Sequence, residues 1–241
     1  MKTHNWVISI VVLAVGCLVV THSEAASIAG KITYQGEVPQ FKAIKMDADP
    51  VCAAKHSGEV LPETLVLGDP ATKTVGNVLV RVINLPIEKS YPVPSEPVVL
   101  TQEGCMYKPH VMALLVGQPF KILNPDGTLH NIHVFSKINA EFNMAMPQFR
   151  KEATRTFDKV EMAPFPVKCD VHPWMQAWLS VMDHPFFCVT QPNGQYKIDN
   201  LPAGTYEIEA WHEKLPAQKT TVTLAEGEAK EVNFTLSVPS K

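Results

Sequence analysis

The sequence predicts an all-β protein of the sandwich or barrel type, and three observations support this. Runs of alternating apolar and polar residues recur along the chain, for example at 28–34, 78–82 and 205–211. This period of two is typical of strands with one buried face. Pro-Asn-Gly at 192–194 and Pro-Ala-Gly at 202–204 are turn signals next to such runs. No amphipathic stretch has convincing helical length, and the 20 prolines oppose long helices.

The first 25 residues have the pattern of an export signal peptide. Lys2 precedes an apolar run over 6–20, and small residues ending at Ala25 offer a cleavage site. The run is shorter than the roughly 20 residues that a membrane span requires. An alternative is lipidation of Cys17, because residues 14–17 loosely resemble a lipobox. We therefore expect a periplasmic or secreted protein without a membrane span after cleavage.

The charge balance argues against a nucleic-acid partner. The formal net charge is −3, and it is unchanged by cleavage because Lys2 and Glu24 are lost together. No basic run is present, whereas proteins that bind nucleic acids carry clustered lysine and arginine. The length after cleavage allows one large all-β domain or two small ones.

The most informative cluster is Cys169, His172 and Met175, which lie within seven residues. The apolar run before Cys169 and the run after Met175 read as strands, so the three side chains share one turn. A thiolate, two imidazoles and a weak thioether form the ligand set of trigonal blue-copper sites. Zinc sites rarely use methionine, so the methionine favours copper over zinc. The second imidazole must come from a neighbouring strand.

His130 and His133 compete for that position. Residues three apart point to opposite faces of a strand. His130 shares its face with the apolar Ile132 and Val134, which indicates the core. This parity favours His130 as the ligand and predicts a structural or surface role for His133.

Four cysteines remain after the leader, at 52, 105, 169 and 188. In an oxidising compartment two of them should pair. Cys169 belongs to the metal cluster, and Cys188 lies in an apolar strand, where a buried inert thiol is expected. A disulfide between Cys52 and Cys105 is the remaining pairing, and it would hold the loop-rich segment 42–62 against the metal-binding domain.

Residues 98–183 resemble a cupredoxin. The stretch 111–126 followed by His130 looks like the central strands of that family, and 169–175 looks like the short ligand loop of its amicyanin-like members. The resemblance implies a Greek-key β-sandwich with one type 1 copper. It also places one ligand at the histidine directly followed by asparagine, so that the Asn131 side chain would tie the two ligand loops together by hydrogen bonds. The implied ligands are His130, Cys169, His172 and Met175.

The C-terminal part resembles the carboxypeptidase regulatory-like, or prealbumin-like, β-sandwich. The resemblance rests on 193–206 and on Glu226-Gly227-Glu228 before the last strand, and the N-terminal runs 28–39 and 76–82 look like the missing first strands. We therefore predict a discontinuous sandwich, residues 27–92 plus 185–241, with the cupredoxin domain 98–183 inserted in it. Insertion is tolerated where the inserted ends lie close together. The competing layout is three domains in series.

Four protein ligands leave no open position for a substrate, which favours one-electron transfer over Lewis-acid catalysis. The cupredoxin resemblance implies electron exchange through the exposed edge of His172 with a transiently docked redox partner. The segment 144–146 is either a soft docking patch or core packing, and Trp174 is either exposed at the docking face or shields the metal.

Two other classes of function remain open. One is a copper-handling or non-catalytic interaction module. The other is a multicopper oxidase or copper nitrite reductase, which needs further histidine clusters, and the chain has no His-x-His pair. It also shows no nucleophile-elbow motif and no phosphate-binding glycine loop. We therefore expect a protein that is not an enzyme.

Overall fold

The computed structural model describes residues 24–85 and 89–238, and this part of the chain is nearly all β. Most of the predicted signal peptide, together with Cys17, lies outside the described residues. No helix in the described part is long and apolar enough to cross a membrane. The elements, in chain order, are β1 (Ala26–Gln35), α1 (Pro50–Ala53), β2 (Leu79–Asn84), β3 (Val98–Gln102), β4 (Tyr107–Lys108), β5 (Val111–Leu115), β6 (Phe120–Leu123), β7 (His130–Val134), β8 (Phe142–Met146), β9 (Glu152–Arg155), β10 (Glu161–Lys168), β11 (Gln176–Met182), β12 (Phe187–Val189), β13 (Gln195–Leu201), β14 (Gly204–Trp211), β15 (Gln218–Leu224), β16 (Ala229–Glu231) and β17 (Phe234–Ser237).

One sandwich combines strands from both ends of the described chain. Its first sheet has the order β13-β1-β16, with β17 also paired to β1, and its second has the order β12-β2-β14-β15. Alternate residues of β1, such as Ile28 and Ile32, are fully buried in the core between the sheets. Between β16 and β17 the side chain of Asn233 accepts the backbone N–H of Lys31.

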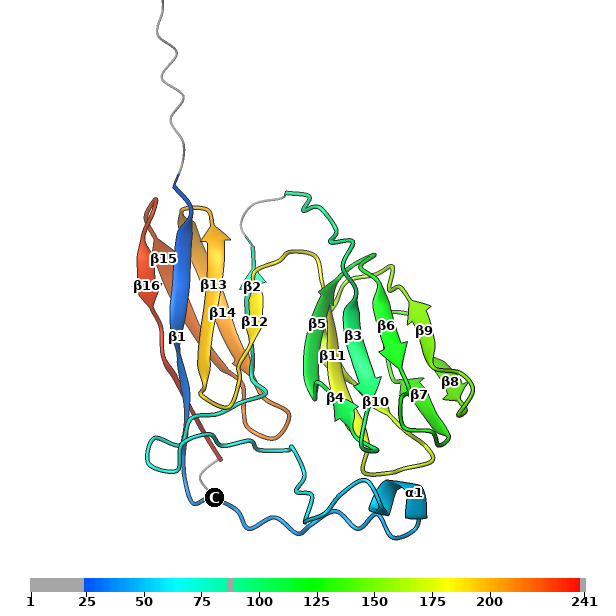
Figure 1. Ribbon diagram of the computed structural model, residues 1–241. Coiled ribbons are helices and arrows are strands. Elements are labelled where there is room, and N and C mark those ends of the chain that lie inside the picture. The colour runs from blue at the N-terminus through cyan, green and yellow to red at the C-terminus, as the bar shows by residue number, and fades with distance from the viewer. Residues whose placement is uncertain (1–23, 86–88, 239–241) are drawn as a thin grey trace, which may run out of the picture.

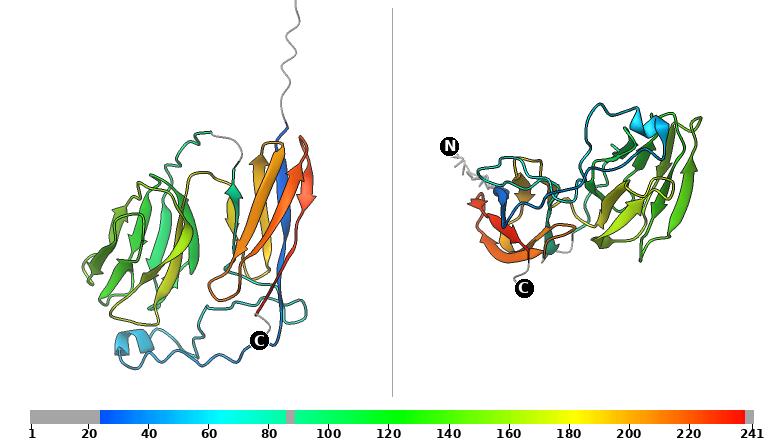
Figure 2. Two further views of the ribbon diagram at one scale, coloured as in Figure 1. Left: turned by 180° about the vertical axis from the view of Figure 1, so that it is seen from behind. Right: turned by 90° about the horizontal axis from the view of Figure 1, so that it is seen from below.

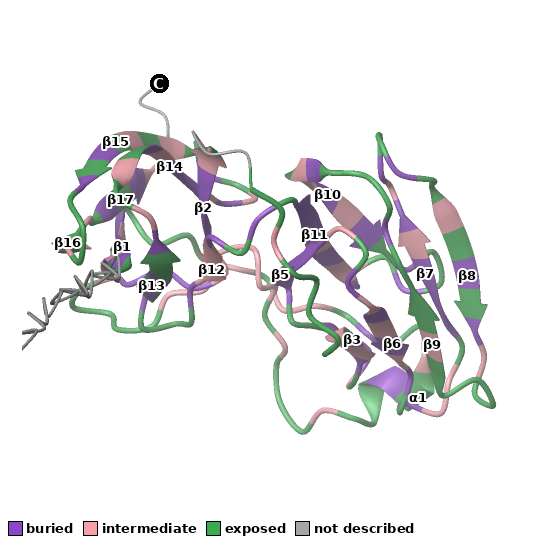
Figure 3. Ribbon diagram, turned by 90° about the horizontal axis from the view of Figure 1, so that it is seen from above, coloured by how far each residue is buried: buried purple, intermediate pink, exposed green. Residues whose placement is uncertain are grey.

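The second sandwich is formed by residues 98–182. Its sheets have the orders β5-β11-β10-β7-β8 and β4-β3-β6-β9, so consecutive strands repeatedly change sheet. Burial alternates along β8 as expected for one buried face (Figure 3), with Met144 and Met146 turned inward. Both methionines belong to the apolar core of this sandwich. Core packing is therefore their role, and the alternative of a docking patch on 144–146 is wrong for these two side chains.

The two sandwiches stand side by side (Figure 2) and share a small apolar cluster. Leu115 and Met182 from the outer face of β5 and β11 are buried against Leu79 of β2. The rings of Trp178 and Trp211 meet edge to face, with centroids 5.3 Å apart. The contact between the sandwiches is therefore a packed surface and not only a pair of chain connections.

Between β1 and β2 the chain leaves the first sandwich and crosses the end of the second, as Figure 1 shows at α1. We call residues 37–66 the strap. Met46 of the strap is buried in the core of the second sandwich, and Ile44 and Val60 pack against that core. The predicted disulfide between Cys52 of the strap and Cys105 is present. The stretch 27–92 is thus not occupied by sandwich strands alone, because the strap covers the neighbouring sandwich.

Acid should destabilise the fold through His212, which is 3% exposed. Its Nδ1 accepts backbone N–H groups of Lys214 and Leu215, and burial lowers its pKa from 6.5 to about 4 against the opposing effect of Glu213. On acidification, His212 therefore binds a proton near pH 6.5 in the unfolded chain but only near pH 4 in the folded protein. The stabilisation from the neutral imidazole is full above pH 6.5 and is lost as the pH falls to 4, by at most about 3 kcal/mol. Urea unfolding across this range should show the loss.

The matched variant is His212→Asn, whose side-chain oxygen can accept the same N–H groups without titrating. Its stability should depend less on pH between 6.5 and 4 than that of the unmodified protein. Equal slopes for the two proteins would contradict the assignment.

Candidate metal centre

The loop 169–175 joins β10 to β11 and is closed by two backbone hydrogen bonds. The N–H of Cys169 donates to the carbonyl of Met175 over 3.1 Å, and the N–H of Met175 donates to the carbonyl of His172 over 2.9 Å. Strand β7 pairs with β10 next to the loop, where His133 lies opposite Lys168. His130 is the first residue of β7. The sheet register therefore carries His130 to the loop.

Three of the predicted ligands meet at one buried point. The Nδ1 atoms of His130 and His172 are 2.9 Å apart, and the Sγ atom of Cys169 is 3.8 Å from the Nδ1 atom of His172. Their residues are 0%, 3% and 2% exposed in the order His130, Cys169 and His172. A metal binds imidazole nitrogen at about 2.0 Å, so one ion could reach both Nδ1 atoms. Met175 is fully buried in the same core, and the donor set fits copper.

The far nitrogen of each imidazole faces a carboxylate. The Nε2 atom of His130 lies 3.0 Å from Oδ2 of Asp126, and the Nε2 atom of His172 lies 2.9 Å from Oδ2 of Asp49. A carboxylate accepts, so each Nε2 donates, which leaves Nδ1 as the atom of each imidazole that a metal would bind. Sequence reasoning missed both acids. Asp126 lies four residues before His130, within reach of a local search, whereas Asp49 is 123 residues from His172 and gives no sequence signal.

Close packing of acids, imidazoles and a thiol shifts the pKa values of the cluster. Burial lowers the pKa of His130, but Asp126 and Cys169 raise it overall. Burial raises the pKa of Asp126, but hydrogen bonds from His130, Lys55 and backbone N–H groups more than offset this and hold that pKa well below its usual range. Burial also raises the pKa of the Cys169 thiol, yet hydrogen bonds from His130 and backbone N–H groups lower it overall. A lower pKa makes the thiolate, the form that binds metals, easier to form.

Asn131 connects the two segments that carry the ligands. Its side-chain oxygen accepts the backbone N–H of Asp170 over 2.7 Å and the thiol of Cys169 over 3.3 Å. Its own carbonyl accepts the hydroxyl of Tyr107. The side chain thus bridges β7 and the loop 169–175, in the way that the resemblance implies.

His172 does not have the exposed edge expected from the cupredoxin resemblance. It is 2% exposed, and the strap covers it with Asp49 and with Cys52, whose Sγ atom is 3.5 Å from Nε2 of His172. The ring of Trp174 also packs against His172, with centroids 5.0 Å apart. Its indole N–H donates to the carbonyl of Cys105. Trp174 therefore shields the cluster, and the expectation that His172 has an exposed edge is wrong.

His133 lies at the surface, away from the buried cluster. Its ring stacks on Phe135 with centroids 4.0 Å apart, and its nitrogens face the carboxylates of Asp170 and Glu141. Burial opposes protonation, but both acids raise the pKa of His133 overall. Surface stacking and ion pairing account for this residue.

Loss of the His133 imidazole should therefore leave metal binding intact. We expect His133→Ala to bind copper within a few-fold of the unmodified protein, whereas His130→Ala should lose the donor next to His172. Isothermal titration with copper measures both variants. Equal losses in the two variants would contradict the choice of His130.

Two further groups of potential ligands border the cluster. Asp49 and His172 lie near Cys52, and Asp126 and His130 lie near Cys105. Both cysteines are joined in the disulfide, so neither provides a thiolate. Among the described residues Cys169 and Cys188 are the free cysteines, which leaves Cys169 as the thiolate of the site.

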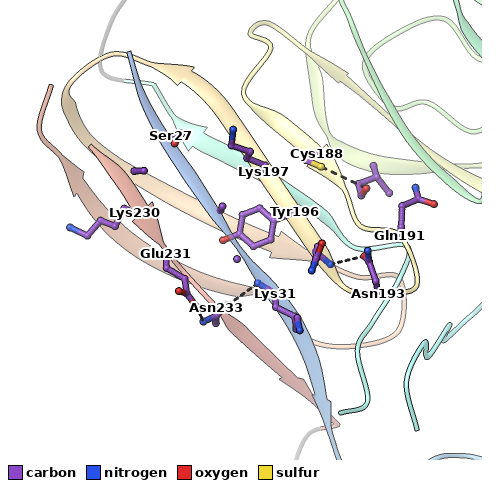
Figure 4. A pocket seen from close by; sticks show the side chains of 15 residues that line it. Ser27, Lys31, Cys188, Gln191, Asn193, Tyr196, Lys197, Lys230, Glu231 and Asn233 are labelled. Atoms are coloured by element: carbon purple, nitrogen blue, oxygen red, sulfur yellow. Dashed lines mark hydrogen bonds between the residues drawn. The ribbon is translucent and has the colours of Figure 1, made fainter. Parts of the chain in front are cut away.

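A separate groove of about 810 Å³ lies on the sheet face formed by β1, β13 and β16. Figure 4 shows Lys31, Lys197 and Lys230 around it, with Tyr196 at its floor. The side chain of Lys197 pairs with Asp199 and that of Lys230 with Glu228. None of the candidate metal ligands lines this groove, so the groove is separate from the metal cluster.

Comparisons with known proteins found similar solved structures and one family match. The chain is similar to a Cu-containing nitrite reductase from Thermus scotoductus SA-01, with 18% identity and a TM-score of 0.33 over 43% of this chain and 26% of that chain. It is similar to a mutant of amicyanin in the Cu(I) form, with 17% identity and a TM-score of 0.32 over 43% of this chain and 98% of that chain. None of the curated proteins matches it. Residues 183–237, which include β12 to β17, match the carboxypeptidase regulatory-like domain family.

Proposed function

We propose that this protein is an exported type 1 copper protein that carries single electrons. The observation that carries the proposal is the meeting of two imidazole Nδ1 atoms, 2.9 Å apart, with the Cys169 thiol in a buried cluster. His130, Cys169, His172 and Met175 would hold the metal. Bound copper supplies one-electron oxidation and reduction, and it is the metal that this donor set selects.

The protein contributes a closed and packed surrounding. The ligand side chains are almost fully buried, the loop 169–175 is fixed by backbone hydrogen bonds, and Asn131 holds that loop to β7. A site that is already packed changes little when its charge changes, and its four donors leave no position for a substrate. We infer from this that the protein transfers electrons and is not an enzyme.

Export is the second part of the proposal. A disulfide between Cys52 and Cys105 is typical of proteins that fold in an oxidising compartment, which agrees with the signal peptide expected at 1–25. We propose a periplasmic or secreted protein with a redox protein as its transient partner.

Copper binding and redox behaviour test the proposal directly. The purified protein should take up one copper(II) ion per chain, turn intensely blue, and show a reversible one-electron wave. A colourless complex with copper(II), or no binding, would refute a type 1 site.

The burial of His172 under the strap favours a second candidate function, which is copper handling. The 2% exposure of His172 leaves that ligand without direct contact to a partner. Tight binding of copper(I) without reversible oxidation would support copper handling over electron transfer.

A further inference from the structure

The strap meets the metal cluster at one side chain, Asp49, and its two carboxylate oxygens have different partners. Oδ1 accepts the backbone N–H groups of Val51 and Cys52 and so caps α1. Oδ2 faces Nε2 of His172 at 2.9 Å and also accepts the hydroxyl of Thr128 over 3.3 Å. One oxygen thus fixes the strap and the other reaches the ligand.

We propose that Asp49 is a positioning residue for the metal centre, which fixes the ring and tautomer of His172 and stabilises the oxidised state. This inference rests on the proposed copper site and extends it to a residue 123 positions away in the chain. The carboxylate accepts the Nε2–H of His172, so the Nδ1 lone pair points to Nδ1 of His130, 2.9 Å away. Partners of this kind orient a ligand and increase its basicity.

Charge gives Asp49 its second effect. An anion next to a buried ligand stabilises the higher positive charge on the metal more than the lower one, and the interaction is strong where water is excluded. His172 is 2% exposed and only part of Asp49 reaches solvent, with a side chain 21% exposed. The ratio of copper(II) to copper(I) affinity should therefore depend on the carboxylate.

The disulfide and a second carboxylate keep Asp49 in place. Cys52, three residues after Asp49, is bonded to Cys105. The N–H of Cys105 donates to Oδ2 of Asp126, which faces His130. The disulfide therefore lies next to both carboxylates, Asp49 beside His172 and Asp126 beside His130. A strap held in this way can maintain a fixed hydrogen bond to His172.

Asp49→Asn separates the two functions of the side chain. Its amide oxygen can still cap α1, because asparagine is as good an N-cap as aspartate, but its amide nitrogen is a donor and cannot accept the Nε2–H of His172. Asp47→Asn is the matched control, because Asp47 is an exposed acid on the same strap. Asp49→Ser, which also caps, serves if the asparagine variant does not fold.

The first readout needs no metal. Long-range proton–nitrogen NMR of the metal-free protein should show the Nε2–H tautomer of His172 in the unmodified protein and in Asp47→Asn. It should show loss of that tautomer as the single species in Asp49→Asn. An unchanged tautomer in Asp49→Asn would overturn the proposal.

The second readout is the affinity for each oxidation state. Asp49→Asn should bind copper(II) roughly 10–100-fold more weakly, with a smaller loss for copper(I), and each tenfold difference between the two losses raises the reduction potential by about 59 mV. Equal losses for both states, or none, would overturn the proposal. If the unmodified protein binds no copper, the proposed function fails, and the tautomer measurement still decides whether Asp49 positions His172.

Discussion

A Cys169→Ser variant is expected to lose the blue colour and most of its affinity for copper(II). The thiol lies 3.8 Å from Nδ1 of His172 and is 3% exposed. Serine has nearly the same size, so the loop 169–175 should keep its hydrogen bonds. A serine hydroxyl stays protonated at neutral pH and forms no thiolate bond, so the loss should exceed the roughly 10–100-fold that follows removal of a partner outside the ligand set. Titration with copper(II) and the absorption spectrum measure both effects.

Cys188→Ser is the matched control for this substitution. Cys188 is the other free cysteine of the described residues and lies half-buried in β12, in the other sandwich. The control should retain the colour and the affinity. A blue Cys169→Ser protein, or a colourless Cys188→Ser protein, would show that the thiolate of the site had been assigned to the wrong cysteine.

The strand pattern of the fold could be read from the sequence because alternation follows directly from burial. The run 205–211 lies within β14, and the run 28–34 lies within β1. What alternation cannot show is which strand lies beside which. The parallel pairing of β1 with β16 and β17 joins residues about 200 positions apart, and the family resemblance, not the alternation, indicated that the two chain ends belong together.

The sequence indicated side chains that lie close together where these are near one another in the chain, and it gave no sign that the strap covers His172. Cys169, His172 and Met175 share one turn, and the parity argument selected His130, which the structure places beside His172. The cupredoxin resemblance implied an exposed His172 because the resemblance covers only 98–183 and does not include the strap. A disulfide between Cys52 and Cys105 was enough to predict that the strap lies near this domain, but not that Asp49 reaches the ligand.

The disulfide gives the second large prediction, because it closes a long loop. Cys52 and Cys105 are separated by 53 residues. Closing a loop of this length lowers the conformational entropy of the unfolded chain, which stabilises the folded state by about 4 kcal/mol. A Cys52→Ala, Cys105→Ala double variant should therefore lose about 4 kcal/mol of unfolding free energy, seen as a lower denaturant midpoint. Cys188→Ala, which breaks no bond, is the control and should lose far less.

The same double variant also separates covalent from non-covalent attachment of the strap. Without the disulfide, the strap keeps the burial of Met46 in the second sandwich and the hydrogen bond of Asp49 to His172. Each of these two contacts contributes less than the disulfide. A hydrogen bond to a charged group contributes about 1.5–3 kcal/mol, and burial of a methionine side chain contributes about the same. Native-state hydrogen exchange should therefore show the strap opening more often, while the β-sheets change only with the global stability. Unchanged exchange in the strap would mean that its packing and the Asp49 contact hold it without the covalent bond.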